Sequence, residues 1–339
     1  MGFSPQAGQV GIRTQSAKGS YADPGAADPN YGIFFKTKSG SFGTKRDLLV
    51  TDPEIGGNRD VSDAYLGPAI FVGEFEFYCR LEAIATLLYG ALGAKSSATS
   101  GAGATLVGTH TLTPADTIPW LSVEEAVANG FEVFQYTDAV VNTLHLEVEA
   151  NGYVQGSVGL IALSQTSGNT KTASPHWDPS NLIVGTNVNV VYNSVTLPAK
   201  KWTLDINNNI EDNDFRLGSL FATDLTPKRR EVMMSCTVRP TDATLWKRAA
   251  YGSSAATSVQ GGTAAKAAIA VDALSYENIN SSSTKYEISL DAPSAAIKPF
   301  DNKVNGDDVL EQDFEIQLFR PTTADLATFT VKNGIATVR

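Results

Sequence analysis

Apolar and polar residues alternate at period two in many stretches of this chain, as they do in half-buried β-strands. Glu74–Cys79 (EFEFYC) is a clear example. An Asn151-Gly152 pair between two such stretches predicts a hairpin turn. The pattern predicts strands at Gly32–Thr37, Val72–Arg80, Asn142–Glu149, Tyr153–Leu163, Val184–Tyr192, Lys201–Ile206, Glu231–Arg239, Lys285–Asp291 and Glu311–Phe319.

A helical period appears twice, over Glu82–Leu92 and Thr241–Tyr251. The first stretch places four apolar residues on one helix face, namely Ile84, Leu87, Leu88 and Ala91. Residues 94–105 and 253–268, which follow the two helices, are rich in Ser, Ala, Gly and Thr. Such composition predicts exposed loops.

The two helical regions resemble each other at an offset of 159 residues, which aligns Pro68 with Pro227 and Gly93 with Gly252. Both halves have the same order of strands, helix and polar loop. We therefore expect a mainly β fold with an internal duplication. It would comprise two tandem β-sandwich or half-barrel domains, 1–165 and 166–339, each with one short flanking helix. Thr109–Asn142 has no clear counterpart in the second half.

Bulk composition indicates a globular chain of 339 residues, with 42% hydrophobic and 18% charged residues. Its formal net charge of −10 argues against a surface that grips nucleic acid. It remains compatible with a negative wall that repels a phosphate backbone. Cys79 and Cys236 stand among apolar neighbours, which predicts buried free thiols. No signal peptide or membrane span is apparent, so we expect synthesis in a cytoplasm and no membrane partner.

Catalytic and metal-binding patterns are not found in the sequence. His110, His145 and His176 lack ligand spacing, and no nucleophile elbow, P-loop or dinucleotide-binding motif occurs. We expect no cofactor and no enzymatic activity. A glycosidase would need two carboxylates in a shared cleft, and the sequence places no two acids together.

The polar faces of the predicted strands contain many acids and few lysines. An ordinary solvated sheet face would explain this. Alternatively, copies joined head to tail would form a ring whose central β-barrel has an acidic lumen, with each helix outside the barrel. The candidate lumen-facing acids are Glu74, Glu76, Glu147, Glu149, Asp205, Glu287, Asp291, Asp313 and Glu315.

Four stretches together resemble one known family: AGQVGIRTQSAKGSYADPG, EIGGNRDVSDAYLGPAIFVGEFEFYCRLEAIATLLYGALGA, the segment from IPWLSVEEAV to GSVGLIAL, and KWTLDINNNIEDNDFRLGSLFATDLTPKRREV. In this order along the chain they resemble the tail tube proteins, or major tail proteins, of long-tailed bacteriophages. The resemblance implies a structural virion protein that assembles into stacked rings around the path of DNA during ejection.

The resemblance also implies partners. Family members with one tube domain form hexameric rings, so a duplicated chain is expected to form rings of three copies. Lys38–Tyr65 and Asn207–Thr223 are candidate contacts between rings, as are the terminal segments. A tape measure protein and DNA would occupy the lumen, without sequence-specific binding. Tail tip and terminator proteins would meet the ends of the tube in the virion tail.

A binding module is the alternative from another class. A capsid decoration protein, a tail terminator or a carbohydrate-binding surface protein would also be a β-sandwich. Such a module would be a compact monomer or small oligomer with an exposed aromatic cluster.

Overall fold

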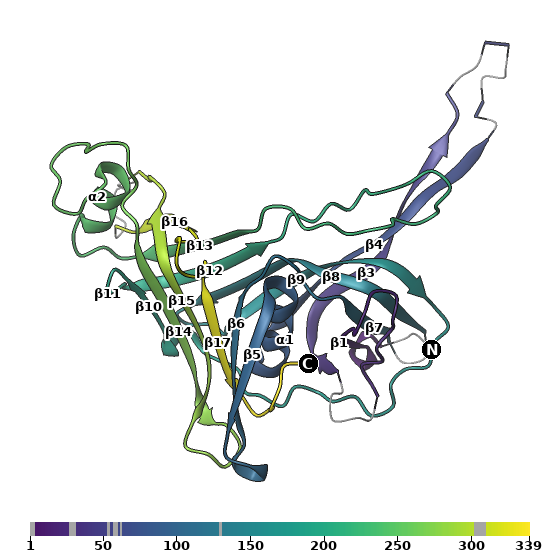
Figure 1. The fold of residues 1–339 in the computed structure, drawn as a ribbon, viewed down its shortest axis with the longest axis horizontal. Helices are drawn as coiled ribbons and strands as arrows, with labels where there is room; N and C mark the ends of the chain where they lie inside the picture. The colour runs from purple at the N-terminus through teal and green to yellow at the C-terminus, as the bar shows by residue number, and fades with distance from the viewer. Residues whose placement is uncertain are drawn as a thin grey trace.

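The structure is a computed structural model that describes residues 4–26, 32–52, 55–56, 60–61, 63–128, 131–301 and 310–339. As the sequence predicts, the fold is mainly β. Its strands are antiparallel and belong to one continuous sheet that folds over into two layers (Figure 1). We refer to residues 1–165 and 166–339 as the first and second halves.

The front layer contains most of the predicted alternating strands, from both halves. The ladder between β8 and β12 joins the two halves edge to edge, from Lys201 opposite Glu149 to Asn207 opposite Thr143. In spatial order the front layer consists of β3 (Thr37–Val50), β4 (Ala64–Tyr78), β9 (Gln155–Thr166), β8 (Glu132–Glu149), β12 (Ala199–Asn207), β13 (Glu231–Val238) and β16 (Gln312–Leu318).

The back layer crosses behind the front layer and also contains strands from both halves (Figure 1). It consists of β10 (Val188–Tyr192), β14 (Ala267–Asn278), β15 (Lys285–Ile297), β17 (Thr328–Asn333), β6 (Val107–Pro114) and β5 (Gly93–Ser100). Strand β15 enters the front layer only at its end, where Ala295–Ile297 pair with β16. Short β11 (Val195–Thr196) pairs with β10. Strand β7 (Leu121–Val127) pairs with β8, β1 (Gln9–Thr14) pairs with β7, and β2 (Ile33–Phe35) pairs with β1.

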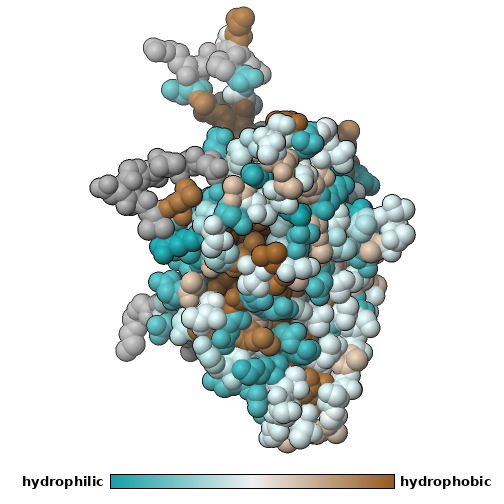
Figure 2. Space-filling view, turned by 90° about the vertical axis from the view of Figure 1, so that its left-hand side faces the viewer, coloured by the Kyte–Doolittle hydropathy of each residue, from teal (hydrophilic) through white to brown (hydrophobic). Residues whose placement is uncertain are grey.

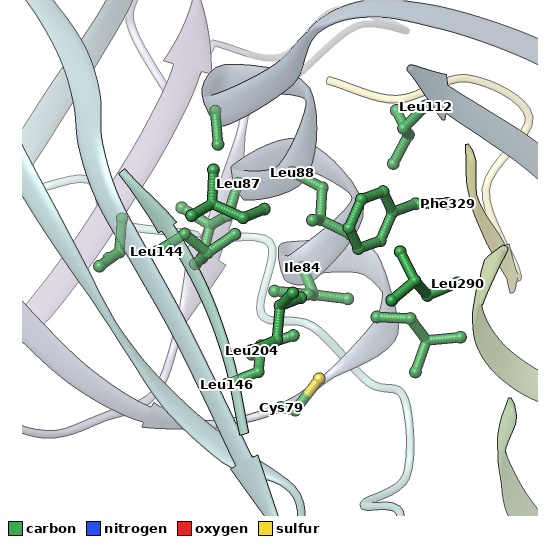
Figure 3. Packing of buried hydrophobic residues seen from close by; sticks show 14 of the residues in the cluster. Cys79, Ile84, Leu87, Leu88, Leu112, Leu144, Leu146, Leu204, Leu290 and Phe329 are labelled. Atoms are coloured by element: carbon green, nitrogen blue, oxygen red, sulfur yellow. The ribbon is translucent and has the colours of Figure 1, made fainter. Parts of the chain in front are cut away.

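Helix α1 (Leu81–Leu92) lies between the two layers rather than outside them. Figure 3 shows Leu144, Leu146 and Leu204 of the front layer on one side of it, and Leu112, Leu290 and Phe329 of the back layer on the other. Helix α1 therefore packs on the apolar side of the front layer, and the back layer covers its other side. Because this helix is apolar on almost every side, burial from both sides stabilises it. Helix α2 (Thr244–Tyr251) has no buried residue and lies at the periphery.

Two segments without an alternating apolar pattern form strands. Residues 94–100 of the Ser/Ala-rich stretch belong to β5, whose backbone pairs with β6 over its whole length. Most of the Lys38–Tyr65 segment is β3 and the start of β4, which form a hairpin that projects from the body (Figure 1). In both cases backbone pairing with a neighbouring strand outweighs weak local β-propensity.

Strand registers in the two halves correspond closely. Phe75 of β4 lies opposite Val158, and Met234, 159 residues after Phe75, lies opposite Ile316. The glycines that end α1 and α2, Gly93 and Gly252, both have positive φ angles of 101° and 81°. The internal duplication and the boundary at residue 165 stay predictions.

Candidate functional site

The front layer has a polar face directed away from the core, and seven of the nine candidate acids lie on it. Backbone register places side chains of successive strands in rows across this face. One row reads Ser39, Glu76, Ser157, His145, Asp205, Met233 and Gln317, and the next contains Tyr78, Gln155, Glu147, Thr203, Ser235 and Glu315. We call this surface the acidic face. Its candidate acids are Glu74, Glu76, Glu147, Glu149, Asp205, Asp313 and Glu315.

Glu287 and Asp291 lie elsewhere. They belong to the part of β15 that pairs with β14 and β17 in the back layer. Their neighbour Leu290 points into the core from the side opposite Leu144 (Figure 3). The two acids therefore lie on the outer surface of the back layer, and Glu287 forms a 2.7 Å ion pair with Lys332. The structure does not bring them together with the other seven.

Basic residues neutralise part of the acidic face. Lys201 lies 3.2 Å from a carboxylate oxygen of Glu147 and 3.5 Å from one of Glu149. Lys298 forms a 2.6 Å ion pair with Glu315. These ion pairs were not predicted from the sequence. The side of the sheet on which Lys201 lies could have been predicted, because Lys201 and Asp205 are four residues apart in one predicted strand, and such residues share a face.

Glu74 and Glu76 are the exposed acids at the β3 end of the acidic face. Glu76 accepts a 2.7 Å hydrogen bond from the Ser39 hydroxyl. Beside Glu74, the glycines Gly73 and Gly159 leave an open hollow of about 480 Å³. Both acids lie on β4, next to the edge strand β3.

Hydrogen bonds shift the pKa values of two residues on the acidic face, His145 and Glu147. The His145 imidazole and an Asp205 carboxylate oxygen lie 2.7 Å apart, and this hydrogen bond raises the pKa of His145. Partial burial of Glu147 favours its neutral form, but hydrogen bonds from Lys201 and Gln155 hold its pKa below the usual value. Glu147 is therefore ionised at neutral pH.

The two segments predicted to contact other rings differ in conformation. Residues 208–230, between β12 and β13, fold back over the apolar end of the front layer of the same chain. The amide of Ala69 donates a 2.8 Å hydrogen bond to the Leu220 carbonyl. A small core encloses Ile70, Val140, Ile161, Leu163, Ile210, Ala222 and Leu225.

By contrast, the β3–β4 hairpin extends away from the body and exposes apolar side chains. Leu48, Leu49 and Leu66 are between 54% and 62% exposed, and Tyr65 is 67% exposed. These residues define what we call the arm. The hairpin lies at the top of Figure 2, where brown spheres mark apolar side chains.

Comparison with known proteins decides the identity of this β-rich chain. A family model described as phage tail tube protein matches residues 6–318. The chain belongs to the phage tail tube protein family. A comparison with curated proteins finds no significant match. This tail tube protein is therefore a structural component of the virion tail.

The remaining histidines and the cysteines of this tail tube protein make contacts within the chain. His110 contacts Ser97 and Asn333, both at 2.9 Å, and His176 lies 3.1 Å from Glu82. Burial raises the pKa of both cysteine thiols to about 12, in agreement with the predicted buried free thiols. Within the described residues, no group of three or more His, Cys, Asp or Glu side chains is arranged to hold a metal ion. Among the helices described, none has the length and hydropathy needed to span a membrane.

Proposed function

We propose that this tail tube protein assembles into rings of three copies, and that stacked rings form a tube with the acidic face as its lumen. The β8–β12 ladder is the observation that supports this proposal best. Through it, two repeats of one chain form a continuous curved sheet without any gap. The same junction repeated between chains would close a barrel.

The free edges of the front layer match the two sides of that internal junction. On β12, one edge pairs with β13 and the other with β8. The corresponding strand β3 pairs only with β4 within the described residues. At the opposite end of the front layer, the backbone amide of Lys298 donates a 2.8 Å hydrogen bond to the Glu315 carbonyl. In the first half, His145 lies opposite Ser157 in the same way. The stretch around Lys298 thus corresponds to the part of β8 that pairs with β12.

This correspondence defines the contact between copies. Residues 296–301 of one copy would pair with β3 of the next, with Lys298 opposite Ser41 of the neighbouring copy. Unpaired strand edges favour such β-addition because their amide and carbonyl groups lack partners. Since each chain contributes two repeats, three copies give an approximately sixfold ring.

The lumen charge explains passage of DNA without binding. A wall bearing Glu74, Glu76 and Asp313 repels phosphates, so the polymer slides without a sequence-specific contact. By resemblance to the family, a tape measure protein fills this lumen before DNA. Tail tip and terminator proteins close the ends, and assembly takes place in the host cytoplasm.

Negative-stain electron microscopy of the concentrated protein tests the proposal. We expect hollow tubes with a regular axial repeat, and end-on views with three chains per ring. A field of dispersed small particles at every concentration would contradict unassisted assembly and favour a binding module.

A further inference from the structure

The arm exposes apolar side chains on both of its faces. Leu48 lies opposite Leu66 in the β3–β4 ladder, and Leu49 lies opposite Tyr65. Consecutive residues of a strand point to opposite faces of a sheet, so Leu48 and Leu49 place apolar surface on either side of the hairpin. The β4–β9 ladder begins at Phe71, so the arm stands beyond the end of β9. An apolar two-stranded hairpin of this kind is stable only when another surface covers it.

The outer part of the arm is also acidic. Residues 47–63 contain five acids and a single arginine. Among these acids, Asp52, Asp60 and Asp63 are exposed. The arm therefore combines leucine side chains with an excess of negative charge. A surface that fits it would be apolar or aromatic at its centre and basic around it.

Helix α2 has this complementary character. Its side chains Leu245 and Ala249 pack against the core. On the opposite side of the helix lie Trp246, Lys247 and Tyr251, all half-buried. The two aromatic rings contact each other edge to face, at a centroid distance of 4.9 Å. We call Trp246, Lys247 and Tyr251 the α2 surface.

The two helices differ in how they are covered. Helix α1 lies between two layers, and 11 of its 12 residues are buried. Helix α2 has no buried residue, because the core covers it on one side only. Residues 239–251, which include α2, contain three basic residues and one acid. The uncovered side of α2 is therefore both aromatic and basic, opposite in charge to the arm.

We propose that the arm of one copy docks on the α2 surface of a copy in the adjacent ring. This inference rests on the proposed tube and names the surface that the arm contacts. Figure 1 shows the arm and α2 at opposite ends of the molecule. When rings stack head to tail, one end of each subunit meets the opposite end of the next. Leucine side chains of the arm then cover Trp246 and Tyr251, and Lys247 lies among the aspartates.

Charge reversal on both partners tests this contact. Lys247→Glu repels the acidic arm and Asp52→Lys repels the basic helix, so each variant alone should need roughly tenfold more protein than wild type to form tubes. The two changes together restore opposite charges, and tubes should form within roughly twofold of the wild-type concentration. Lys285→Glu, at an exposed lysine that begins β15, is the matched control and should assemble as wild type does. All these variants should keep the wild-type melting temperature.

Photo-crosslinking identifies the contacted surface directly. Native Cys79 and Cys236 are buried, so a benzophenone maleimide labels Leu49→Cys selectively on the folded protein. After irradiation of tubes, we expect mass spectrometry to find links to residues 239–251, which the arm cannot reach within its own chain because the two lie at opposite ends (Figure 1). The same label on Glu277→Cys, an exposed position on the back layer, should give no such link.

The outcomes separate this inference from the proposed function. If tubes form but the combined variant assembles no better than the single ones, or the label links to another segment, the α2 contact is overturned and the tube stands. Links to α2 without tubes would retain the contact and overturn the tube. Wild-type protein that gives neither tubes nor links would contradict both proposals.

Discussion

The carboxylate of Asp178 accepts a 2.7 Å hydrogen bond from the backbone amide of Ala83, although 95 residues separate the two. The same oxygen accepts a 3.0 Å bond from the amide of Glu82, and the Ser180 hydroxyl accepts one from Leu81. The segment at the start of the second half therefore caps the N-terminus of α1. Burial raises the pKa of Asp178, which is 3% exposed.

Loss of this remote cap should destabilise the protein. Asp178→Ala leaves the first amides of α1 buried without acceptors, so we expect the free energy of unfolding to fall by about 2 kcal/mol or more. Urea denaturation at neutral pH measures the change. Asp242→Ala provides a control, because Asp242 bonds the exposed amide of Thr244 at the start of α2. An equal loss in both variants would contradict the special role of Asp178.

Reversal of charge on the acidic face should affect DNA passage rather than assembly. In particles with Glu74, Glu76, Glu147 and Glu315 changed to Lys, we expect tubes of normal length and DNA ejection slowed roughly tenfold, because phosphates would bind the wall. Ejection kinetics from purified particles measure this effect. Glu277→Lys with Asp291→Lys, both exposed on the back layer, should leave ejection unchanged. Normal ejection from the first variant would contradict an acidic lumen.

The buried acid Glu125 should make stability dependent on pH. Burial raises its pKa to about 7, against the lowering effect of a 3.1 Å hydrogen bond from Tyr136. The unfolded chain loses this proton at a lower pH than the folded chain, so stability falls as pH rises from about 4.5 to 7 and stays low above. Glu125→Gln removes this pH dependence. The free energy of unfolding of the variant, relative to wild type, should be higher at pH 8 than at pH 5 by on the order of 2 kcal/mol. Urea titrations at both pH values measure the difference, and an equal effect at both would refute the titration.

The arm should act between rings and contribute little within one chain. Changing Leu48, Leu49 and Leu66 to Ser removes apolar side chains that already face solvent, so the free energy of unfolding should change by less than about 0.5 kcal/mol per site. We expect rings that no longer stack. Analytical ultracentrifugation and electron microscopy distinguish single rings from tubes. Val259→Ser, at an exposed valine outside the arm, serves as the control.

Period-two alternation predicted the strands of the front layer other than β3, because each of them has one face in the core. Strands β3 and β5 were harder to predict. Strand β5 has no alternating apolar residues, and β3 is exposed along almost its whole length. Local sequence contained no signal for either strand, since backbone pairing with distant residues stabilises both.

Alternation also explains the mixed result for the candidate acids. It separates the core side of a strand from the solvent side, but it does not tell which of two layers the strand joins. Asp205 and Asp291 therefore looked alike in sequence, although they lie on opposite surfaces. The hollow lined by Gly40, Ala126 and Trp177 could not be predicted, because these residues meet only in the folded chain.

The pairing of β17 with β6 has a consequence for biosynthesis. Phe329 lies against α1 in the shared core, and Val331 lies opposite His110 of the first half. The first half cannot complete its core until residues more than two hundred positions later have left the ribosome. An incomplete nascent chain therefore lacks the folded surface that assembly needs. A tube can grow only by adding subunits whose synthesis has passed β17.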